Sequence, residues 1–285
     1  DVIKKHEKTR EEKETDRTRH IEATSSQTGP VFLTYPDRKE IDALVSSVTS
    51  QQPPLFDVKA DDGVRHTVWR MPQEGGNDIV KLFAAVPKLY IADGHHRAAA
   101  ASRVRAARRD ANSDHTGDEE YNRVLSVIFP AGQMQILPYN RVVSDLNSLE
   151  PAQFTAKIKE FFDVTETTSP APEKPGIIHM FLDGKWWRLE YKGDLSRMAT
   201  VDKLDVSILQ NNLLEPLLGI RDPRSDKRID FVGGIRGTDE LEQRVQKGEA
   251  AVAFSMYATT VEELMAIADA NEIMPPKSTW FEPKL

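Results

Sequence analysis

Residues 93–97 (Asp-Gly-His-His-Arg) follow an apolar segment, 89–92, and lead into an alanine-rich one, 95–107, which they overlap. The apolar segment predicts a buried strand, and the alanines favour a helix. The first amides of a helix have no partner within the helix, and the helix dipole favours an anion there. Gly94 would let the backbone approach that anion, and Arg97 could hold phosphate oxygens with two hydrogen bonds. The pattern predicts a phosphate-binding turn at a helix N-terminus.

The other side chains of this turn have more than one candidate role. Asp93 could cap the helix or act as a ligand of a magnesium ion at the phosphates. His95 and His96 are candidate donors to phosphate. We do not expect them to share a metal ion, because adjacent residues on a helix point in different directions. The alternative to the whole reading is an ordinary left-handed turn with histidines on the surface.

A second polar block, residues 6–10 (His-Glu-Lys-Thr-Arg), lies in a stretch of mixed charge that runs from Lys4 to Glu22. Pairs such as Lys8 and Glu12 have the i,i+4 spacing that favours a helix, but the stretch lacks an apolar stripe. It is therefore either a solvated bridge or a strip of functional side chains. The chain starts at Asp1 without a methionine, and we interpret it as a fragment with a segment missing upstream.

The composition limits the classes of protein that the chain can belong to. Its 285 residues suffice for one large domain or two of ordinary size. The net charge of −7 gives no overall field that would attract DNA or an anionic membrane, and no apolar run approaches the length of a membrane span. Because the chain has no cysteine, disulfides and thiol chemistry are excluded. A cytoplasmic location is expected.

Local patterns predict an α/β protein of two domains. The first would span residues 1–164, with strands at 31–35, 64–70 and 124–129, a turn at Gly75-Gly76, and helices at 37–48 and 151–162. The stretch 165–176 is rich in Pro, Thr and Glu and is the predicted linker. In the domain 177–285, Asp183-Gly184 predicts a hairpin of 177–182 with 185–191, and Thr260 with Glu263 predicts a capping box.

Three other segments could contact ligands. Gly233-Gly234 followed by Arg236 could form a second anion-binding turn, although a tight loop explains the glycines nearly as well. The tail 277–284 could present Lys277 to a ligand or serve as a strap anchored by its aromatic residues, and we favour the strap. The arginines in 103–109 could touch nucleic acid, but a solvated helix face is the favoured reading.

The segment 90–97 (Tyr-Ile-Ala-Asp-Gly-His-His-Arg) closely resembles the signature of domain-of-unknown-function family 1015. Three further blocks agree with that family, at residues 6–17, 230–236 and 274–284. The family is related to the ParB/sulfiredoxin superfamily, which includes free-serine kinases. The resemblance implies a ParB/sulfiredoxin-like nucleotide-binding domain followed by a second α/β domain.

The resemblance also implies roles for individual residues. In the superfamily, the turn that matches Gly94 to Arg97 binds nucleotide phosphates. In the serine kinases, the glutamate of an upstream His-Glu pair is the base toward the substrate hydroxyl, and Glu7 after His6 matches it. A carboxylate suits that task, since a hydroxyl attacking a phosphoryl group must give up its proton. Glu7 and Asp93 are much further apart than in the kinases, which implies an insertion.

The expected function is therefore phosphoryl transfer from ATP or ADP to a small hydroxyl metabolite, with free serine indicated by the resemblance. Glu7, Asp93 and His95 would be catalytic, with magnesium at the phosphates and Asp93 as its candidate ligand. Further candidates for substrate or phosphate contacts are His6, Lys8, Thr9 and Arg10. A nucleotide and a small molecule are the expected partners, a second copy of the chain is a candidate, and nucleic acid and membranes are not expected. The alternative function is a non-catalytic nucleotide-binding regulator.

Overall fold

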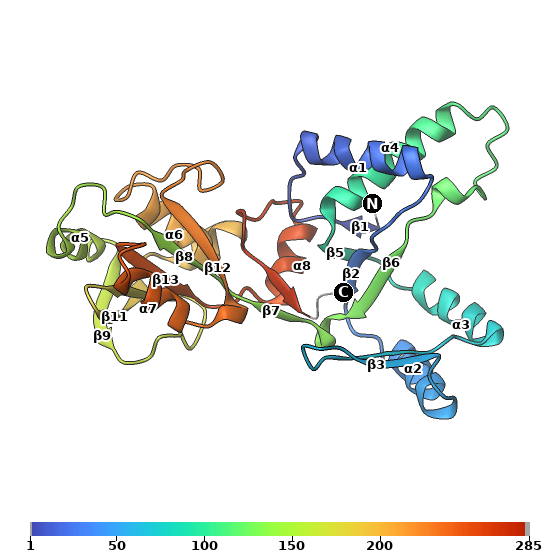
Figure 1. The fold of residues 1–285 in the computed structure, drawn as a ribbon, viewed down its shortest axis with the longest axis horizontal. Coiled ribbons are helices and arrows are strands. Elements are labelled where there is room, and N and C mark those ends of the chain that lie inside the picture. The colour runs from blue at the N-terminus through green and yellow to red at the C-terminus, as the bar shows by residue number, and fades with distance from the viewer. Residues whose placement is uncertain (1, 283–285) are drawn as a thin grey trace.

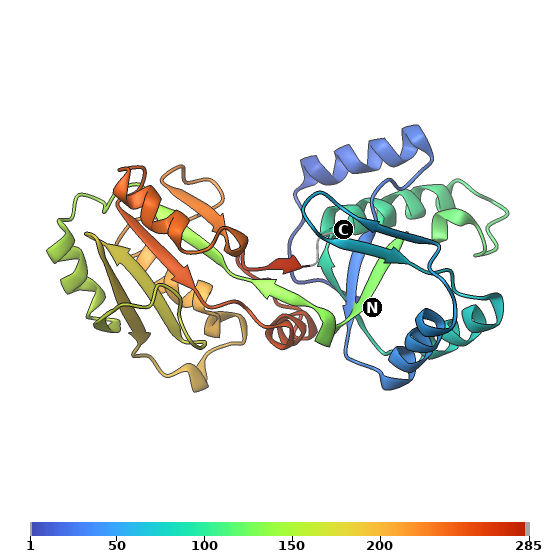
Figure 2. The same cartoon turned by 60° about the horizontal axis from the view of Figure 1, so that its bottom comes forward.

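The computed structural model describes residues 2–282, which form two lobes, each built around a β-sheet (Figures 1 and 2). The sheet of the first lobe has the order β1-β5-β2-β6, formed by Ile3–Lys4, Leu89–Asp93, Val31–Tyr35 and Ser126–Pro130. In this sheet β1 runs parallel to β5 and β2 parallel to β6, whereas β2 and β5 are antiparallel. The chain is thus a mixed α/β protein, as the sequence predicts.

The second lobe contains a larger sheet whose paired strands are all antiparallel. Its order is β12-β8-β13-β10-β11-β9, formed by Ile229–Gly233, Tyr139–Val143, Val252–Met256, Ile177–Leu182, Lys185–Tyr191 and Phe162–Thr167. Two small sheets complete the pairing: β3 (Phe56–Lys59) with β4 (Arg65–Val68), and β7 (Gln135–Leu137) with β14 (Trp280–Glu282). Because β7 comes from the connection between the lobes, β14 ties the end of the chain to their junction (Figure 1).

Helices cover both sheets. They are α1 (Glu11–Thr24), α2 (Lys39–Gln51), α3 (Gln73–Ala84), α4 (His95–Asp110), α5 (Pro151–Ile158), α6 (Asp205–Leu209), α7 (Asp239–Gln246) and α8 (Val261–Asp269). In the first lobe α1 lies along α4, and α2 packs on α3 (Figure 1). Within residues 2–282, no helix combines the length and the apolar character needed to cross a membrane.

Several predicted elements are confirmed because their signals are local. The hairpin of β10 and β11 turns at Asp183 and Gly184, whose φ angles of 52° and 74° are those of a type I′ turn. The hydroxyl of Thr260 accepts a hydrogen bond from the Glu263 amide, and the Glu263 carboxylate accepts one from the Thr260 amide, which completes the predicted capping box. The strand and helix on either side of Gly94 form as predicted.

Other predictions require correction. The predicted linker, 165–176, begins inside β9 and so is part of the larger sheet. The chain passes from the first sheet to the larger one earlier, between β6 and β8. Gly75 and Gly76 lie inside α3 rather than in a turn, because the apolar face of α3 packs against Tyr35 and Ile41. The charged N-terminal helix begins only at Glu11, since the chain before it pairs with β5.

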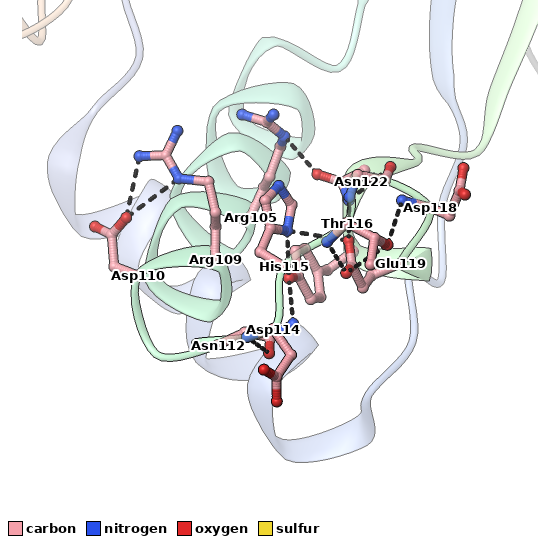
Figure 3. A network of polar contacts seen from close by, with 12 residues as sticks. Arg105, Arg109, Asp110, Asn112, Asp114, His115, Thr116, Asp118, Glu119 and Asn122 are labelled. Carbon is pink, nitrogen blue, oxygen red and sulfur yellow. Dashed lines mark hydrogen bonds and ion pairs between the residues drawn. The ribbon is translucent and has the colours of Figure 1, made fainter.

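The connection that follows α4 is organised around one carboxylate, that of Glu119 (Figure 3). It accepts hydrogen bonds from the Thr116 amide and hydroxyl, from the Gly117 amide and from the Asn122 side chain. The hydrogen bonds from Thr116 and Gly117, led by that of the Thr116 amide, lower the pKa of Glu119 to about 2. Because Arg105 of α4 donates to Asn122, the network fixes this connection to the helix.

The hydrophobic core is continuous between the lobes. One cluster of buried side chains includes Phe32 and Tyr90 of the first sheet together with Phe281 of β14 and a large set from the second sheet, among them Phe254. The rings of Phe32 and Phe281 meet edge to face with centroids 6.2 Å apart. The junction between the lobes is therefore packed with buried side chains.

Candidate functional site

A cleft of about 670 Å³ lies at the junction, where β5 gives way to α4. Three segments distant in sequence meet there: residues 6–10, residues 93–97 and residues 274–279, which we call the strap. Further side chains complete its lining, namely Lys13, Asp16, Arg17, Tyr139 and Arg224. The fold thus brings together the N-terminal block and the predicted phosphate-binding turn, with part of the C-terminal segment beside them.

The turn itself depends on glycine. Gly94 precedes α4 with φ of 94°, a left-handed conformation that other residues rarely adopt. A Cβ atom at this position would lie 2.8 Å from Nη2 of Arg97, whose guanidinium folds back over the turn and donates to Asp93 over 3.0 Å. The first bond of the helix runs from the Ala98 amide to the Gly94 carbonyl, so the amides of residues 95–97 have no acceptor within the helix.

His6 and His95 form the floor of the cleft. Their rings pack edge to face with centroids 4.5 Å apart, and the residues are only 3% and 6% exposed. Burial lowers the pKa of His6 to about 3 and that of His95 to about 4, because a charged ring would lose its hydration. Both rings are therefore neutral at pH 7.

The histidines of the turn join the N-terminal block to α4. Nε2 of His95 accepts from the His6 amide at 3.5 Å, and Nε2 of His96 accepts from the Arg10 amide at 3.0 Å. Since Nε2 of the neutral His95 ring is an acceptor, its hydrogen is on Nδ1. That nitrogen lies 3.6 Å from Oε2 of Glu7. The two rings thus fix the backbone of the block, and His95 faces Glu7.

The remaining residues of the N-terminal block surround this point. The Glu7 side chain is 52% exposed and borders the cleft, where a ligand can reach it. The Thr9 hydroxyl donates to Glu14 over 2.9 Å, which occupies it locally. Lys8 and Arg10 line the cleft.

The strap closes the cleft from the side of the second lobe. The Met274 amide donates to the His6 carbonyl over 2.9 Å, which ties the strap to the N-terminal block. Nζ of Lys277 lies 5.2 Å from the centre of the Tyr139 ring. The Ser278 hydroxyl donates to the Pro275 carbonyl. β14 thus anchors the tail, as the favoured reading expects, and Lys277 lines the cleft.

The charge of the cleft is predominantly positive. Three carboxylates border it, those of Glu7, Asp16 and Asp93, against seven basic side chains, those of Lys8, Arg10, Lys13, Arg17, Arg97, Arg224 and Lys277. A cleft whose low-dielectric walls carry mainly positive charge raises the local concentration of anions. The arrangement suits a ligand with several negative charges.

A family model described as "Protein of unknown function (DUF1015)" matches residues 1–207. This chain belongs to the DUF1015 family. A search of curated proteins finds no significant match.

Among solved structures, a free serine kinase variant in complex with AMP has a TM-score of 0.48 and 15% identity, over 98% of this chain and 84% of that one. SbnI with a C-terminal truncation, from Staphylococcus aureus, has a TM-score of 0.49 and 13% identity, over 99% and 79%. A conserved hypothetical protein from Pyrococcus furiosus has a TM-score of 0.43 and 16% identity, over 98% and 87%. These similarities are too weak to carry an argument about this DUF1015 member.

Two residues of the DUF1015 cleft, Tyr139 and Arg224, have no local sequence signal. Tyr139 begins β8 and Arg224 lies in the connection before β12, so only the fold brings them to the turn. By contrast, Gly233 and Gly234 do not line the cleft. A Cβ at Gly233 would lie 2.5 Å from the Trp280 ring, and one at Gly234 would lie 2.7 Å from Pro138. These two glycines therefore permit close packing, as a tight loop requires.

The described side chains of this DUF1015 protein include no group of three or more carboxylates and imidazoles arranged to hold a metal ion. Magnesium needs fewer protein ligands than that. It keeps several waters and usually takes one or two carboxylates in addition to substrate phosphates. Asp93 borders the cleft beside the turn and fits the role of a single carboxylate ligand.

Proposed function

We propose that this DUF1015 protein binds a nucleoside di- or triphosphate at the turn between β5 and α4 and transfers its terminal phosphoryl group to the hydroxyl of a small metabolite. The family resemblance suggests ATP or ADP as the donor and free serine as the acceptor. The observation that carries the proposal is the meeting of Glu7 with the phosphate-type turn in one cleft, through the 3.6 Å approach of Glu7 to His95.

The phosphates would be held mainly by groups that keep their positions when the ligand arrives. The amides of residues 95–97 point from the helix N-terminus, and Arg97 lies over the turn. Lys8 and Lys277 add positive charge from two other walls. In this scheme His95 and His96 contribute their backbone amides, since their Nε2 atoms already accept from the N-terminal block.

Glu7 would serve as the general base. The acceptor hydroxyl oxygen attacks the terminal phosphorus, the bond from that phosphorus to the leaving phosphate breaks, and the hydroxyl proton passes to the Glu7 carboxylate. The Nδ1 hydrogen of neutral His95 faces this carboxylate and would hold its orientation. Magnesium, when bound to the phosphates, supplies charge neutralisation, and Asp93 would be its protein ligand.

The test is an assay of the chain with ATP or ADP, magnesium and serine, with phosphoserine measured by mass spectrometry. We expect Glu7→Gln to lower the rate of formation by about 100-fold or more, the usual scale for loss of a general base, while nucleotide affinity changes little. Glu12→Gln is the matched control, because Glu12 is an exposed glutamate of α1 that does not line the cleft. It should leave the rate unchanged.

Two outcomes would contradict parts of the proposal. Tight nucleotide binding without transfer to serine or other small hydroxyl compounds would favour the non-catalytic regulator. Full activity of Glu7→Gln would exclude Glu7 as the base and leave the phosphate site to be tested separately.

A further inference from the structure

A second basic group, the guanidinium of Arg141, is buried outside the cleft. Arg141 lies in β8, is only 3% exposed, and is paired across the sheet with Phe231 of β12, whose ring centre is 5.5 Å from its Cζ. Its Nη atoms donate to the carbonyls of Tyr139 and Lys277. Among the described side chains, no carboxylate forms an ion pair with it.

This arrangement leaves a positive charge in the interior without a counter-ion. Burial lowers the pKa of Arg141 to about 9, and loss of hydration is the cause. The group nevertheless stays charged at pH 7. The contact with Phe231 and the two carbonyls are the interactions that replace its hydration, and none of them carries a negative charge. An anion beside the guanidinium would supply the missing compensation.

A cavity of about 90 Å³ lies at this position. Its basic side chains are those of Arg141 and Arg221, and no acidic side chain lines it. Most other walls are apolar, formed by Val206, Leu214, Pro223, Ile229, Phe231, Pro275 and Pro276. The side-chain amide of Gln210 also borders it, but that amide already donates to the Ile220 carbonyl. The cavity therefore combines a buried cation with an apolar interior.

The size of the cavity limits the ligand. One water needs roughly 10–15 Å³ of such space, so the cavity can hold a molecule of about half a dozen heavy atoms. That is far too small for a nucleotide. Pro275 and Pro276 of the strap border both spaces, but Arg141 does not line the cleft.

We propose that this cavity is a binding site for a small monocarboxylate, whose carboxylate pairs with Arg141 and whose short apolar body contacts Val206, Leu214 and Ile229. A charge-assisted pair with a buried arginine gives selectivity for the anion over a neutral compound of the same shape. The site does not depend on the proposed phosphoryl transfer, because it shares none of the residues assigned to that reaction.

The experiment is calorimetric titration of the full chain with acetate, propionate, isobutyrate and lactate, and with propionamide as the neutral counterpart of propionate. At least one carboxylate should bind with a dissociation constant of about 1 mM or lower, and propionamide should not. Arg141→Met should weaken this binding by about tenfold or more. Arg97→Met should leave it unchanged, because Arg97 belongs to the cleft.

A second variant keeps the proposal testable if Arg141→Met does not fold. Arg221→Gln changes an exposed side chain at the cavity and should weaken the same carboxylate by about threefold, as expected for a partly solvated charge. The proposal is overturned if none of the four carboxylates binds, if propionamide binds equally well, or if carboxylate binding is unchanged in every folded variant.

Discussion

The floor of the cleft and the Arg141 cavity both bury basic side chains, with opposite results. His6 and His95 meet burial by losing their proton, since their pKa values fall to about 3 and about 4. Arg141 cannot do so, because even a pKa of about 9 leaves it charged at neutral pH. The difference arises from the intrinsic pKa values of imidazole and guanidinium. The histidine pair therefore needs no counter-ion, although Nδ1 of His6 is buried without a hydrogen-bond partner among the described residues. The buried arginine keeps a charge that an anion would balance.

The other charged side chains of the cleft are less buried than the histidine pair and than Arg141. They are partly solvated, as Arg97 is at 38% exposure. Water compensates such charges until a ligand replaces it, and each contributes little to stability. The cleft is thus suited to bind a large anion reversibly, and the cavity to enclose a small one.

The largest expected effect is a loss of nucleotide affinity when the turn at Gly94 is changed. Gly94→Ala would place a methyl group 2.8 Å from Nη2 of Arg97 and strain a φ of 94°. Because Arg97 must then move, we expect nucleotide affinity to fall by about 100-fold, equivalent to about 2.7 kcal/mol. Titration with ADP measures this.

The control is Gly76→Ala, since a methyl group there meets no atom within 4 Å and lies in α3. It should leave nucleotide affinity unchanged and raise the free energy of unfolding slightly. Equal losses of affinity in both variants would show that the effect is general destabilisation.

The second effect concerns the neutral histidines. In the unfolded chain His95 takes up a proton below about pH 6.5, but in the folded protein only below about pH 4. The unfolded state therefore binds more protons between these values, and the contribution of His95 to stability is lost as the pH falls through this window. At pH 5 that loss is about 2 kcal/mol.

Urea unfolding at pH 7.5 and pH 5 isolates this contribution when the wild type is compared with His95→Gln. On acidification, the free energy of unfolding of the variant should fall by about 2 kcal/mol less than that of the wild type. Asp205 acts in the opposite direction, because burial raises its pKa to about 7, but it is common to both proteins. The control His66→Gln alters an exposed histidine of β4 and should behave as the wild type. An identical pH dependence in His95→Gln would mean that folding does not lower the pKa of His95.

The smallest effect tests the solvated charges. Lys277→Gln removes one cation from the strap wall, and we expect about threefold to fivefold weaker nucleotide binding, because an exposed charge contributes up to about 1 kcal/mol. The difference should shrink at high salt. Lys59→Gln in the exposed strand β3 should have no effect. A salt-independent loss would indicate that Lys277 acts through packing instead.

The cleft was predictable from sequence to the extent that its signals are contiguous. The strand, glycine and helix at residues 89–110 are adjacent in the chain, and the distinctive block at residues 6–10 could be recognised independently. That Glu7 meets His95 could not be derived, because they lie 88 positions apart in the sequence. Pairing of β1 with β5 brings them together.

The Arg141 cavity left no signal that sequence reasoning could use. Arg141 stands in a short strand, β8, that was not predicted, and the other cavity walls come from α6, the segment 210–223 that follows it, β12 and the strap. The boundary between the sheets was misplaced for a related reason. Composition marks residues 165–176 as a linker, but long-range pairing with β11 draws the beginning of that segment into β9.

A crystal structure with ADP and magnesium tests the central claim most directly. The account predicts that the terminal phosphate lies within hydrogen-bond distance of the amides of residues 95–97 and of the Arg97 guanidinium, with Glu7 beside it. A nucleotide bound with its phosphates elsewhere, and with the turn after β5 unoccupied, would contradict it.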